Sequence, residues 1–492
     1  MCLGLAAVIL LALSAACDEK APPVQSPAAE RLSASNAMGV GHWNGELRVT
    51  AGLKLRLVLH VEAAKAPSTT LTALLDSPDQ GAKGLPVNLI EVQDGKLVFE
   101  LKGIGARFEG ELNKAGNEAK GIWSQGPAKL PITFKKSDTP SLEPKRPQTP
   151  QGIPPYRAEA VKFENKAAAA TLAGTLTLPR GDGPFPAALL ITGSGPQDRD
   201  ETIFAHKPFL VIADALTRRG VAVLRYDDRG VAESTGSSTK ATSADFADDA
   251  LAGIAYLKSR RDVDPNRIGI IGHSEGGIIA AMIAAETPSL AFIVMLAGTG
   301  VPGDDIVRKQ LVDVLKSTGA DAAAVKKAVD FQSTALDIAE REIDPRVADA
   351  KLRKLGEDVL KDEPDEIRTR MKPILDQQLG MLVSPWFRYF LAFDPGPALS
   401  KTRCPVLALN GEKDTQVDAS VNLTAIRAAL GHGKNPDATT RALPGLNHLF
   451  QPCKTGSPQE YVQIETTFEP TALKLLSDWV VEHTLKTVPI AK

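Results

Sequence analysis

The sequence predicts an α/β protein: a mostly parallel sheet flanked by helices, with a helical cap insertion, preceded by a separate all-β domain. Three observations support this prediction. The chain has 492 residues, which is too long for one ordinary hydrophobic core. Its N-terminal part alternates apolar and polar residues, which is typical of antiparallel strands. Its larger C-terminal part alternates continuous apolar runs with helical patterns, which is typical of a parallel sheet covered by helices.

Residues 1–17 predict a secretory signal of the bacterial lipoprotein type. The run "CLGLAAVILLALSAA" is apolar or small throughout, and it is shorter than the ~20 residues of a membrane-spanning helix. The small residues before Cys17 resemble a lipoprotein cleavage site, where the cysteine becomes the lipid-modified N-terminus. We expect an exported protein that faces the periplasm and contacts the membrane through this lipid. Ordinary secretion and an uncleaved anchor are the alternatives.

A polar tether rich in proline and alanine, residues 18–38, precedes the predicted antiparallel β-domain, residues 39–136. In "KLRLVLHVE", which begins at Lys54, every second residue is apolar. The same alternation follows an Asp94-Gly95 turn in "GKLVFELKG". Alternation interrupted by such turns predicts β-hairpins with one face buried.

A Pro-rich linker, residues 137–156, separates the β-domain from the predicted α/β domain, residues 157–492. Apolar runs that end in polar residues or glycine then recur: "FPAALLITGSG", "VAVLRYDDRG", "RIGIIGHS", "LAFIVMLAG" and "CPVLALNGEKD". Continuous runs indicate strands buried on both faces. About residues 301–398 contain helical patterns alone, including an Asp344-Pro345 helix start, and predict a cap on the sheet.

The segment "RIGIIGHSEGGIIAAMI" gives the strongest indication of chemistry in the chain. It predicts a buried strand, a sharp turn and a helix, and the turn holds Gly272-His273-Ser274-Glu275-Gly276. In this context the G-x-S-x-G pattern is a nucleophile elbow, which exposes the serine hydroxyl at the carboxyl edge of the sheet. The elbow therefore predicts an α/β-hydrolase fold with Ser274 as nucleophile. The alternative is a tight structural turn with an idle serine.

A serine nucleophile needs a general base, and the base needs an acid that orients it. In this fold class the acid follows the serine, and the histidine follows the acid. Asp414 ends a buried strand in "CPVLALNGEKDTQV", and His448 follows a late strand in "RALPGLNHLFQ". We predict that Ser274, Asp414 and His448 form a catalytic triad. Glu412 is the rival acid, and the non-catalytic alternatives are a turn aspartate and an ordinary loop histidine.

The same chemistry needs two N–H groups for the oxyanion. We assign these to the backbone of Glu275, the residue after the nucleophile, and of Ser194, in the loop "LLITGSGPQDRDE". Residues 198–201 of this loop are charged, and we interpret them as an ion-pair network that fixes the loop, with substrate recognition as the alternative. Arg229, in "YDDRGVAES", either braces its loop or approaches the pocket.

Several kinds of ligand are not indicated. A formal net charge of −2 gives no indication of nucleic-acid or anionic-membrane binding. The histidines are scattered and no phosphate-cradling motif precedes a helix, so neither a metal nor an organic cofactor is predicted. Cys404 begins the strand that Asp414 ends, whereas Cys453 follows His448. A seven-residue strand spans ~23 Å, so no disulfide is expected between the two cysteines.

Six motifs in order resemble one group of bacterial α/β-hydrolases: "GSGPQDRDE", "YDDRGVAESTG", "GHSEGG", "SPWFRYFLAFDP", "CPVLALNGEKDTQV" and "LPGLNHLFQ". The group includes EstD-type carboxylesterases and serine-aminopeptidase-like hydrolases, and the similarity covers about residues 157–485. Its matching Ser, Asp and His form the triad, and relatives often carry a β-domain with a segment like "DSPDQGAKGLP". One departure is Ala232, where glycine is usual.

The sequence thus predicts a serine hydrolase that cleaves small-molecule carboxylic esters through an acyl-enzyme intermediate. A serine aminopeptidase or thioesterase on the same triad is the alternative. A less favoured alternative is an envelope binding protein with a subordinate hydrolase domain. Trp43 and Trp123 would then be ligand platforms, but we interpret both as core residues. The cap aromatics of "PWFRYFLAF" either line an acyl pocket or pin the cap to the body.

Overall fold

In the computed structural model, the described residues are 39–48, 54–63, 70–78, 82–126, 128–138, 145–317 and 319–485. They divide into two compact units, with the division between Lys145 and Arg146. Cys17 and the predicted signal lie outside the described residues. Within these ranges, no helix combines the length and the apolar character needed to cross a bilayer.

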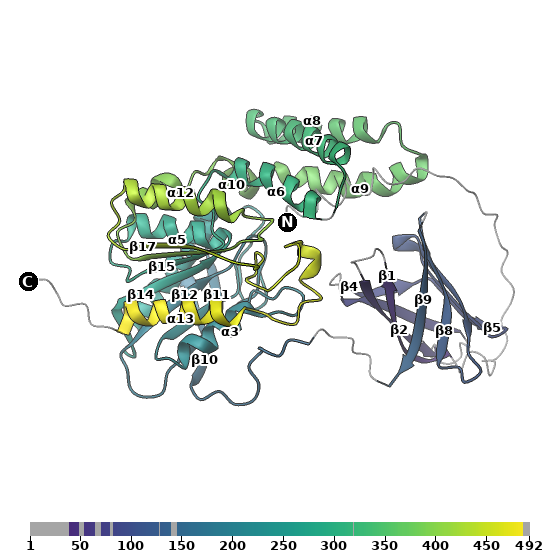
Figure 1. Cartoon of the computed structure of the whole chain (residues 1–492), viewed down its shortest axis with the longest axis horizontal. Helices are drawn as coiled ribbons and strands as arrows, with labels where there is room; N and C mark the ends of the chain where they lie inside the picture. Colours follow the sequence, from purple (N-terminus) through teal and green to yellow (C-terminus); the bar gives the residue numbers. More distant parts are fainter. Residues whose placement is uncertain are drawn as a thin grey trace, which may run out of the picture. The chain divides into compact units, whose positions relative to one another are not determined.

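The first unit is a nine-stranded sheet in which every paired strand runs antiparallel to its neighbour. The prediction of an all-β domain ahead of the α/β domain is therefore confirmed. The strand order is β4-β3-β2-β1-β9-β8-β7-β6-β5 (Figure 1). The strands are β1 (Gly41–Arg48), β2 (Lys54–Ala63), β3 (Leu71–Ser77), β4 (Ala82–Val87), β5 (Leu89–Gln93), β6 (Lys96–Leu101), β7 (Ala106–Leu112), β8 (Glu118–Gln125) and β9 (Ala128–Ser137).

Aromatic side chains fill the core of this unit. The ring centroid of Phe99 lies 5.2 Å from that of Phe108 and 5.6 Å from that of Phe134. Trp43 is 0% exposed and Trp123 is 2% exposed. The interpretation of both tryptophans as core residues is confirmed, because neither presents a ring to solvent as a ligand platform would.

The Asp94-Gly95 turn joins β5 to β6, with Gln93 paired to Lys96. Asp94 and Gly95 have positive φ angles of 52° and 76°. A two-residue hairpin needs this left-handed geometry because its twist matches that of the strands. The dipeptide is therefore the reason that the two strands pair in this register.

The second unit is an eight-stranded sheet in the order β10-β11-β13-β12-β14-β15-β16-β17. β10, β11 and β13 pair antiparallel, and the remaining strands pair in parallel. Cys404 and Cys453 are both free thiols, as expected. The strands are β10 (Arg157–Asn165), β11 (Ala170–Leu178), β12 (Phe185–Ile191), β13 (Ala222–Tyr226), β14 (Val263–His273), β15 (Ile293–Leu296), β16 (Val406–Gly411) and β17 (Ala438–Leu443).

The central strands of this sheet are buried on both faces. On β14, Ile270 packs in one hydrophobic cluster and Ile271 in another. The sheet lies between two helix layers, with α3 and α13 on one face and α5 and α12 on the other (Figure 1). The helices of the body are α3 (Pro208–Thr217), α4 (Ser243–Ser259), α5 (Glu275–Glu286), α11 (Gly396–Lys401), α12 (Ala419–His432) and α13 (Pro470–Leu485).

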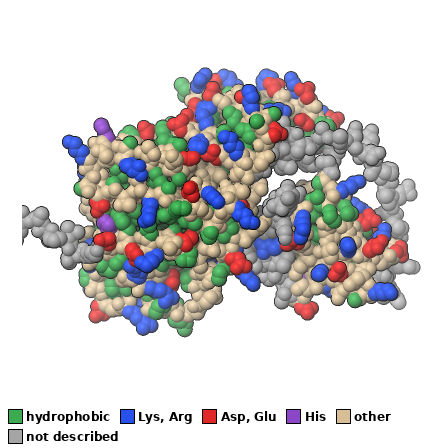
Figure 2. Space-filling view, viewed as in Figure 1, with side chains coloured by type: hydrophobic (Ala, Val, Ile, Leu, Met, Phe, Trp, Pro, Cys, Tyr) green, Lys and Arg blue, Asp and Glu red, His purple; other side chains and the backbone are tan. Residues whose placement is uncertain are grey.

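Between β15 and β16, the described residues form helices and no strand, as predicted for the cap. Asp344 caps the helix that begins at Pro345, accepting from the N–H of Arg346. The cap carries intermixed charges of both signs (Figure 2), with ion pairs such as Lys326–Asp330 at 2.6 Å. The cap helices are α6 (Gly303–Ser317), α7 (Ala322–Arg341), α8 (Pro345–Leu360), α9 (Asp365–Leu382) and α10 (Pro385–Ala392).

The end of the Pro-rich segment is anchored to the second unit by backbone carbonyls. The Arg146 guanidinium donates to the carbonyls of Phe204, Val462 and Ile464 at 2.8, 3.0 and 2.9 Å. Five N–H groups on one rigid side chain suit such convergent carbonyls. The chain from Arg146 onward is therefore part of the second unit.

We expect Leu75→Ala to lower the free energy of unfolding by about 2–5 kcal/mol, because a buried leucine leaves a cavity when truncated. Leu75 on β3 is 1% exposed, whereas its neighbour Leu74 is 47% exposed. Leu74→Ala is the matched control and should change the free energy by less than about 0.5 kcal/mol. Chemical denaturation followed by tryptophan fluorescence measures both, and equal losses would contradict this assignment of the two faces.

Candidate active site

The turn at Ser274 is formed by close packing of backbone. Ser274 alone connects β14 to α5, with φ 52° and ψ −115°. A Cβ on Gly272 would lie 1.9 Å from the Gly276 carbonyl oxygen, and a Cβ on Gly276 would lie 2.2 Å from the Ile191 oxygen. Only glycine fits at either position, which is the physical reason for the G-x-S-x-G pattern.

Asp414 and His448 are hydrogen-bonded to each other and buried. His448 Nδ1–H donates to Asp414 Oδ2 at 2.7 Å, and the two side chains are 6% and 0% exposed. Asp414 Oδ1 accepts from the N–H groups of Gln416 and Val417 at 2.8 and 2.9 Å. These bonds fix the carboxylate. With the Nδ1 proton bonded to Asp414, Nε2 is the ring nitrogen available to accept a proton, as a general base requires.

Strand pairing brings the Asp414 and His448 loops together. β16 and β17 pair in parallel up to Gly411 and Leu443. The Lys413 N–H then donates to the Leu446 carbonyl at 2.9 Å, so the pairing continues into the loops. A Cβ on Gly411 would lie 2.4 Å from the Leu446 oxygen, which accounts for the glycine before the acid.

The rival acid has a different role. The Glu412 carboxylate is exposed and accepts from the Gly445 N–H at 3.0 Å. His483, a histidine late in the chain, lies 3.0 Å from Asp437 through its Nε2 and stacks on Trp479. Of the two candidate acids, the structure pairs Asp414 with His448.

The histidine loop lies against the elbow. His273 Nε2–H donates to the His448 carbonyl at 3.1 Å, and the two ring centroids are 4.8 Å apart. Because His273 directly precedes Ser274, this bond holds His448 beside the predicted nucleophile. The Ser274 hydroxyl and His448 are not hydrogen-bonded in the described structure. In ligand-free enzymes this contact commonly tightens when substrate binds.

The two predicted oxyanion donors, Ser194 and Glu275, both lie at the elbow. A Cβ on Gly193 would lie 3.2 Å from Ser274 Cβ, so the Ser194 loop approaches the nucleophile closely. The Gly193 N–H already donates to Glu201 Oε1 at 2.7 Å, whereas the Ser194 N–H has no acceptor among the described residues. Glu275 is the first residue of α5, where backbone N–H groups have no acceptor within the helix.

The charged run in the Ser194 loop is an ion-pair network. Arg199 Nε donates to Asp227 Oδ1 at 3.0 Å, and Asp200 pairs with the buried Arg225. Both partners belong to β13 or the turn that follows it. For Arg199 and Asp200, the interpretation of this run as a loop-fixing ion-pair network is confirmed.

Arg229 braces helix α4. Its guanidinium donates to both carboxylate oxygens of Asp249 at 2.6 and 2.8 Å and to the Asp245 carbonyl at 2.6 Å. Of the two roles predicted for Arg229, the bracing role is therefore confirmed. Ala232, in the same loop, has a φ of 45°. This left-handed conformation explains why glycine is usual at the position in the group that the sequence resembles.

Asp228 supports the loop that carries Ser194. Its Oδ1 accepts from Thr192 Oγ1 and its Oδ2 from the Gln197 N–H, both at 2.9 Å. Burial raises the pKa of Asp228 to about 8 against the lowering effect of these two hydrogen bonds, and the carboxylates of Glu275 and Glu201 raise it further. Asp228 therefore keeps its proton near neutral pH.

The Glu275 side chain connects the elbow to the cap. Its Oε1 accepts from Ser243 Oγ at 2.6 Å and from Trp386 Nε1 at 2.8 Å. Burial raises the pKa of Glu275, and the two hydrogen bonds offset this only in part. Trp386 is 9% exposed and stacks on Phe390. For Trp386, this contact favours the interpretation that the cap aromatics pin the cap to the body.

These contacts define the class of protein. A glycine-flanked serine between a central parallel strand and a helix, at the same sheet edge as an Asp–His pair, is the arrangement of α/β-hydrolases. The chain belongs to the alpha/beta hydrolase family, whose model matches residues 188–464.

Individual relatives cover smaller parts of the chain. Esterase EstD of Thermotoga maritima is 37% identical over 165 residues, which are 33% of this chain and 39% of that protein. The putative hydrolase YtaP of Bacillus subtilis is 34% identical over 123 residues, 21% of this chain and 40% of that protein. The chain thus matches about two fifths of the length of each curated relative.

Solved esterase structures are also similar. The Pyrococcus furiosus esterase Pf2001 has 15% identity and a TM-score of 0.42, with 70% of this chain and 98% of that chain covered. Est1E from Butyrivibrio proteoclasticus, with ferulic acid bound, has 16% identity and a TM-score of 0.38, with 68% and 100% covered.

We expect the Asp228 carboxyl to make folding stability fall as pH rises from about 4 to about 8. The unfolded chain loses this proton near 3.8, the ordinary pKa of an aspartate, whereas the folded protein holds it until about 8. Over this window the unfolded state binds fewer protons, and one proton contributes at most about 1.4 kcal/mol per pH unit. Denaturation across pH should show this slope in the wild type and a weaker slope in Asp228→Asn.

The neighbouring Asp227 provides the control. Burial tends to raise the pKa of Asp227, but Arg199 and backbone N–H groups lower it below its ordinary value. Its contribution is therefore present above the unfolded pKa and is lost as pH falls through the folded pKa. Asp227→Asn should change the slope of folding stability against pH below about pH 4. It should leave this slope unchanged between pH 4 and pH 8. Identical pH profiles for the two variants would contradict the assignment.

Proposed function

We propose that the protein is a serine hydrolase that cleaves carboxylic esters. The observation that carries this proposal is the buried 2.7 Å hydrogen bond between His448 and Asp414, with the His448 carbonyl tied to the residue before Ser274. A buried Asp–His pair beside an elbow serine provides a base, its orienting acid and a nucleophile in one place.

In the proposed mechanism, His448 Nε2 removes the proton from Ser274 Oγ as the oxygen attacks the acyl carbonyl. The N–H groups of Ser194 and Glu275 donate to the oxyanion of the tetrahedral intermediate. His448 then gives the proton to the leaving alcohol, and an acyl-enzyme on Ser274 remains. A water, deprotonated by His448, attacks this ester and releases the carboxylic acid. Asp414 stabilises the imidazolium that forms in each half of the reaction.

Similarity to a curated relative favours esters over amides as substrates. The curated relative with 37% identity over a third of the chain is named an esterase. Small-molecule acyl esters are therefore the proposed substrates, and aminoacyl anilides and thioesters are the comparison substrates for the alternatives on the same triad.

We expect Ser274→Ala to abolish labelling by a fluorophosphonate probe and to lower turnover of p-nitrophenyl esters by at least about 10³-fold, since the nucleophile is lost. Asp414→Asn should lower kcat by up to about 10⁴-fold, because an amide stabilises the wrong histidine tautomer. Glu412→Gln is the matched control and should keep wild-type activity. A folded wild type that neither reacts with the probe nor hydrolyses esters would reject the proposal.

We further propose that the protein is exported and anchored through a lipid on Cys17. This rests on the apolar run of residues 2–16 and the small residues before Cys17. In cells fed radiolabelled palmitate, the wild-type protein should incorporate the label and Cys17→Ser should not. Cys2→Ser, which changes a cysteine within the signal, is the control and should still incorporate the label. Labelling that survives in Cys17→Ser would contradict lipidation at this site.

A further inference from the structure

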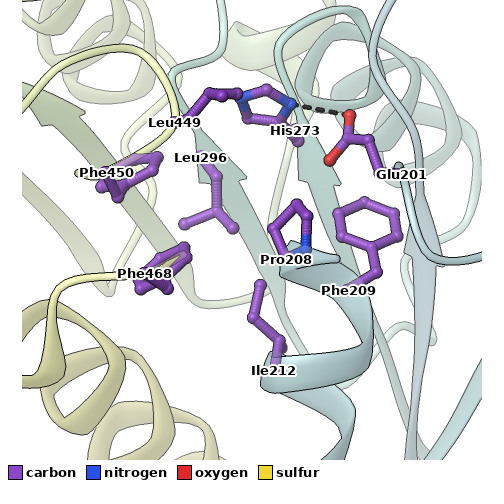
Figure 3. Close-up of a pocket in the computed structure, with 9 residues that line it drawn as sticks. All are labelled: Glu201, Pro208, Phe209, Ile212, His273, Leu296, Leu449, Phe450 and Phe468. Atoms are coloured by element: carbon purple, nitrogen blue, oxygen red, sulfur yellow. Dashed lines mark hydrogen bonds and ion pairs between the residues drawn. The ribbon is translucent and has the colours of Figure 1, made fainter. Parts of the chain in front are cut away.

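Glu201 and His273 form a buried pair (Figure 3), and His273 directly precedes Ser274, the proposed nucleophile. His273 Nδ1 lies 2.8 Å from Glu201 Oε1, and the two side chains are 7% and 2% exposed. Neither residue belongs to the proposed triad or to the proposed oxyanion hole. A buried ionisable pair at such a site needs a physical role, because desolvating it is costly.

The partners of His273 determine its protonation state. The His448 carbonyl oxygen can only accept, so His273 Nε2 carries a proton. Glu201 Oε1 already accepts the Gly193 N–H, so a proton on Nδ1 completes the second hydrogen bond. Burial lowers the pKa of His273, but Glu201, the His448 carbonyl and Asp414 together raise it above its ordinary value. The two acceptors, one facing each ring nitrogen, favour the imidazolium form of His273.

The cavity beside this pair has an otherwise apolar lining. A cavity of about 10 Å³, close to the space of a single water, borders Glu201 and His273. Leu296, Phe468 and Ile212 line it, and Figure 3 shows the ion pair at one end of this apolar lining. The charged groups that face the His273 ring are Glu201 and, beyond the neighbouring His448, Asp414. Low local polarity strengthens each hydrogen bond of the pair.

The pair joins the two loops that carry the proposed chemistry. Glu201 Oε1 holds the Gly193 N–H, which directly precedes the oxyanion donor Ser194. His273 Nε2–H holds the carbonyl of His448, which is the proposed base. One continuous chain of hydrogen bonds therefore runs from the oxyanion loop through His273 to the histidine loop.

We propose that Glu201 and His273 are positioning residues that hold the oxyanion loop and the histidine loop in register around Ser274. This inference rests on the proposed function. Misplacing a reacting group by about 1 Å can cost about 10²-fold in rate, so the pair should act on kcat. The proposed mechanism places neither residue in contact with the substrate, so KM should stay unchanged.

The first test is spectroscopic and independent of activity. In wild-type protein labelled with ¹⁵N-histidine, the His273 ring, assigned through His273→Phe, should show two protonated nitrogens at pH 7. Glu201→Gln keeps an oxygen for the Gly193 N–H and removes the charge, so this ring should become neutral. A neutral His273 ring in the wild type would show that Glu201 and His273 do not form this charged pair, and would overturn the inference.

The second test is kinetic. Glu201→Gln should lower kcat for p-nitrophenyl esters by about tenfold to a hundredfold with KM within twofold, and His273→Phe should do the same. Since the two residues act as one unit, the double variant should lose no more than His273→Phe alone. The matched control is Glu233→Gln. It removes an exposed carboxylate that pairs with Arg199 in the ion-pair network of the Ser194 loop, and it should keep wild-type kcat.

The outcomes separate this inference from the proposed function. A wild type with ester turnover and probe labelling, combined with unchanged kcat in Glu201→Gln, overturns the positioning role alone. A raised KM with unchanged kcat in either single variant also overturns it. So does a double variant in which the free-energy losses derived from the two single kcat values add. A wild type without any turnover overturns both proposals.

Discussion

The site depends on the backbone contact between the end of β14 and the start of α5. The carbonyl of Gly276 lies where a Cβ on Gly272 would be, and the Ile191 carbonyl lies where a Cβ on Gly276 would be. This packing forces Ser274 into a left-handed backbone conformation and turns its side chain out of the sheet. The helix that follows then directs its first N–H groups to the same point.

Around the turn, four buried carboxyl groups are held by donors from different segments. Asp414 has His448 and two backbone N–H groups, Glu201 has His273 and Gly193, Asp228 has Thr192 and Gln197, and Glu275 has Ser243 and Trp386. Each carboxyl links segments that are far apart in the sequence, so these polar contacts help to determine how the segments at this sheet edge are positioned. Since buried acids are costly unless satisfied, the loops are stabilised in one arrangement.

Much of the fold could be predicted because local patterns determine it. Alternation indicated the strands of the β unit, continuous apolar runs indicated the parallel strands, and the Asp344-Pro345 pair indicated a helix start that the structure contains. The elbow could be predicted for the same reason, because steric contacts within a short segment require its two glycines. The Glu201–His273 and Glu275–Trp386 contacts were not predictable, because each joins residues 72 or 111 positions apart that no periodicity relates.

The indole of Trp386 has a consequence for engineering of the cap. Glu275 receives one of its two hydrogen bonds from this cap residue and the other from α4 of the body. A chimera that imports the cap of another enzyme without an equivalent donor would leave a desolvated acid next to Ser274. Cap exchange in this scaffold therefore requires either that the foreign helix bring its own tryptophan or that the acid be replaced by an apolar residue of similar volume.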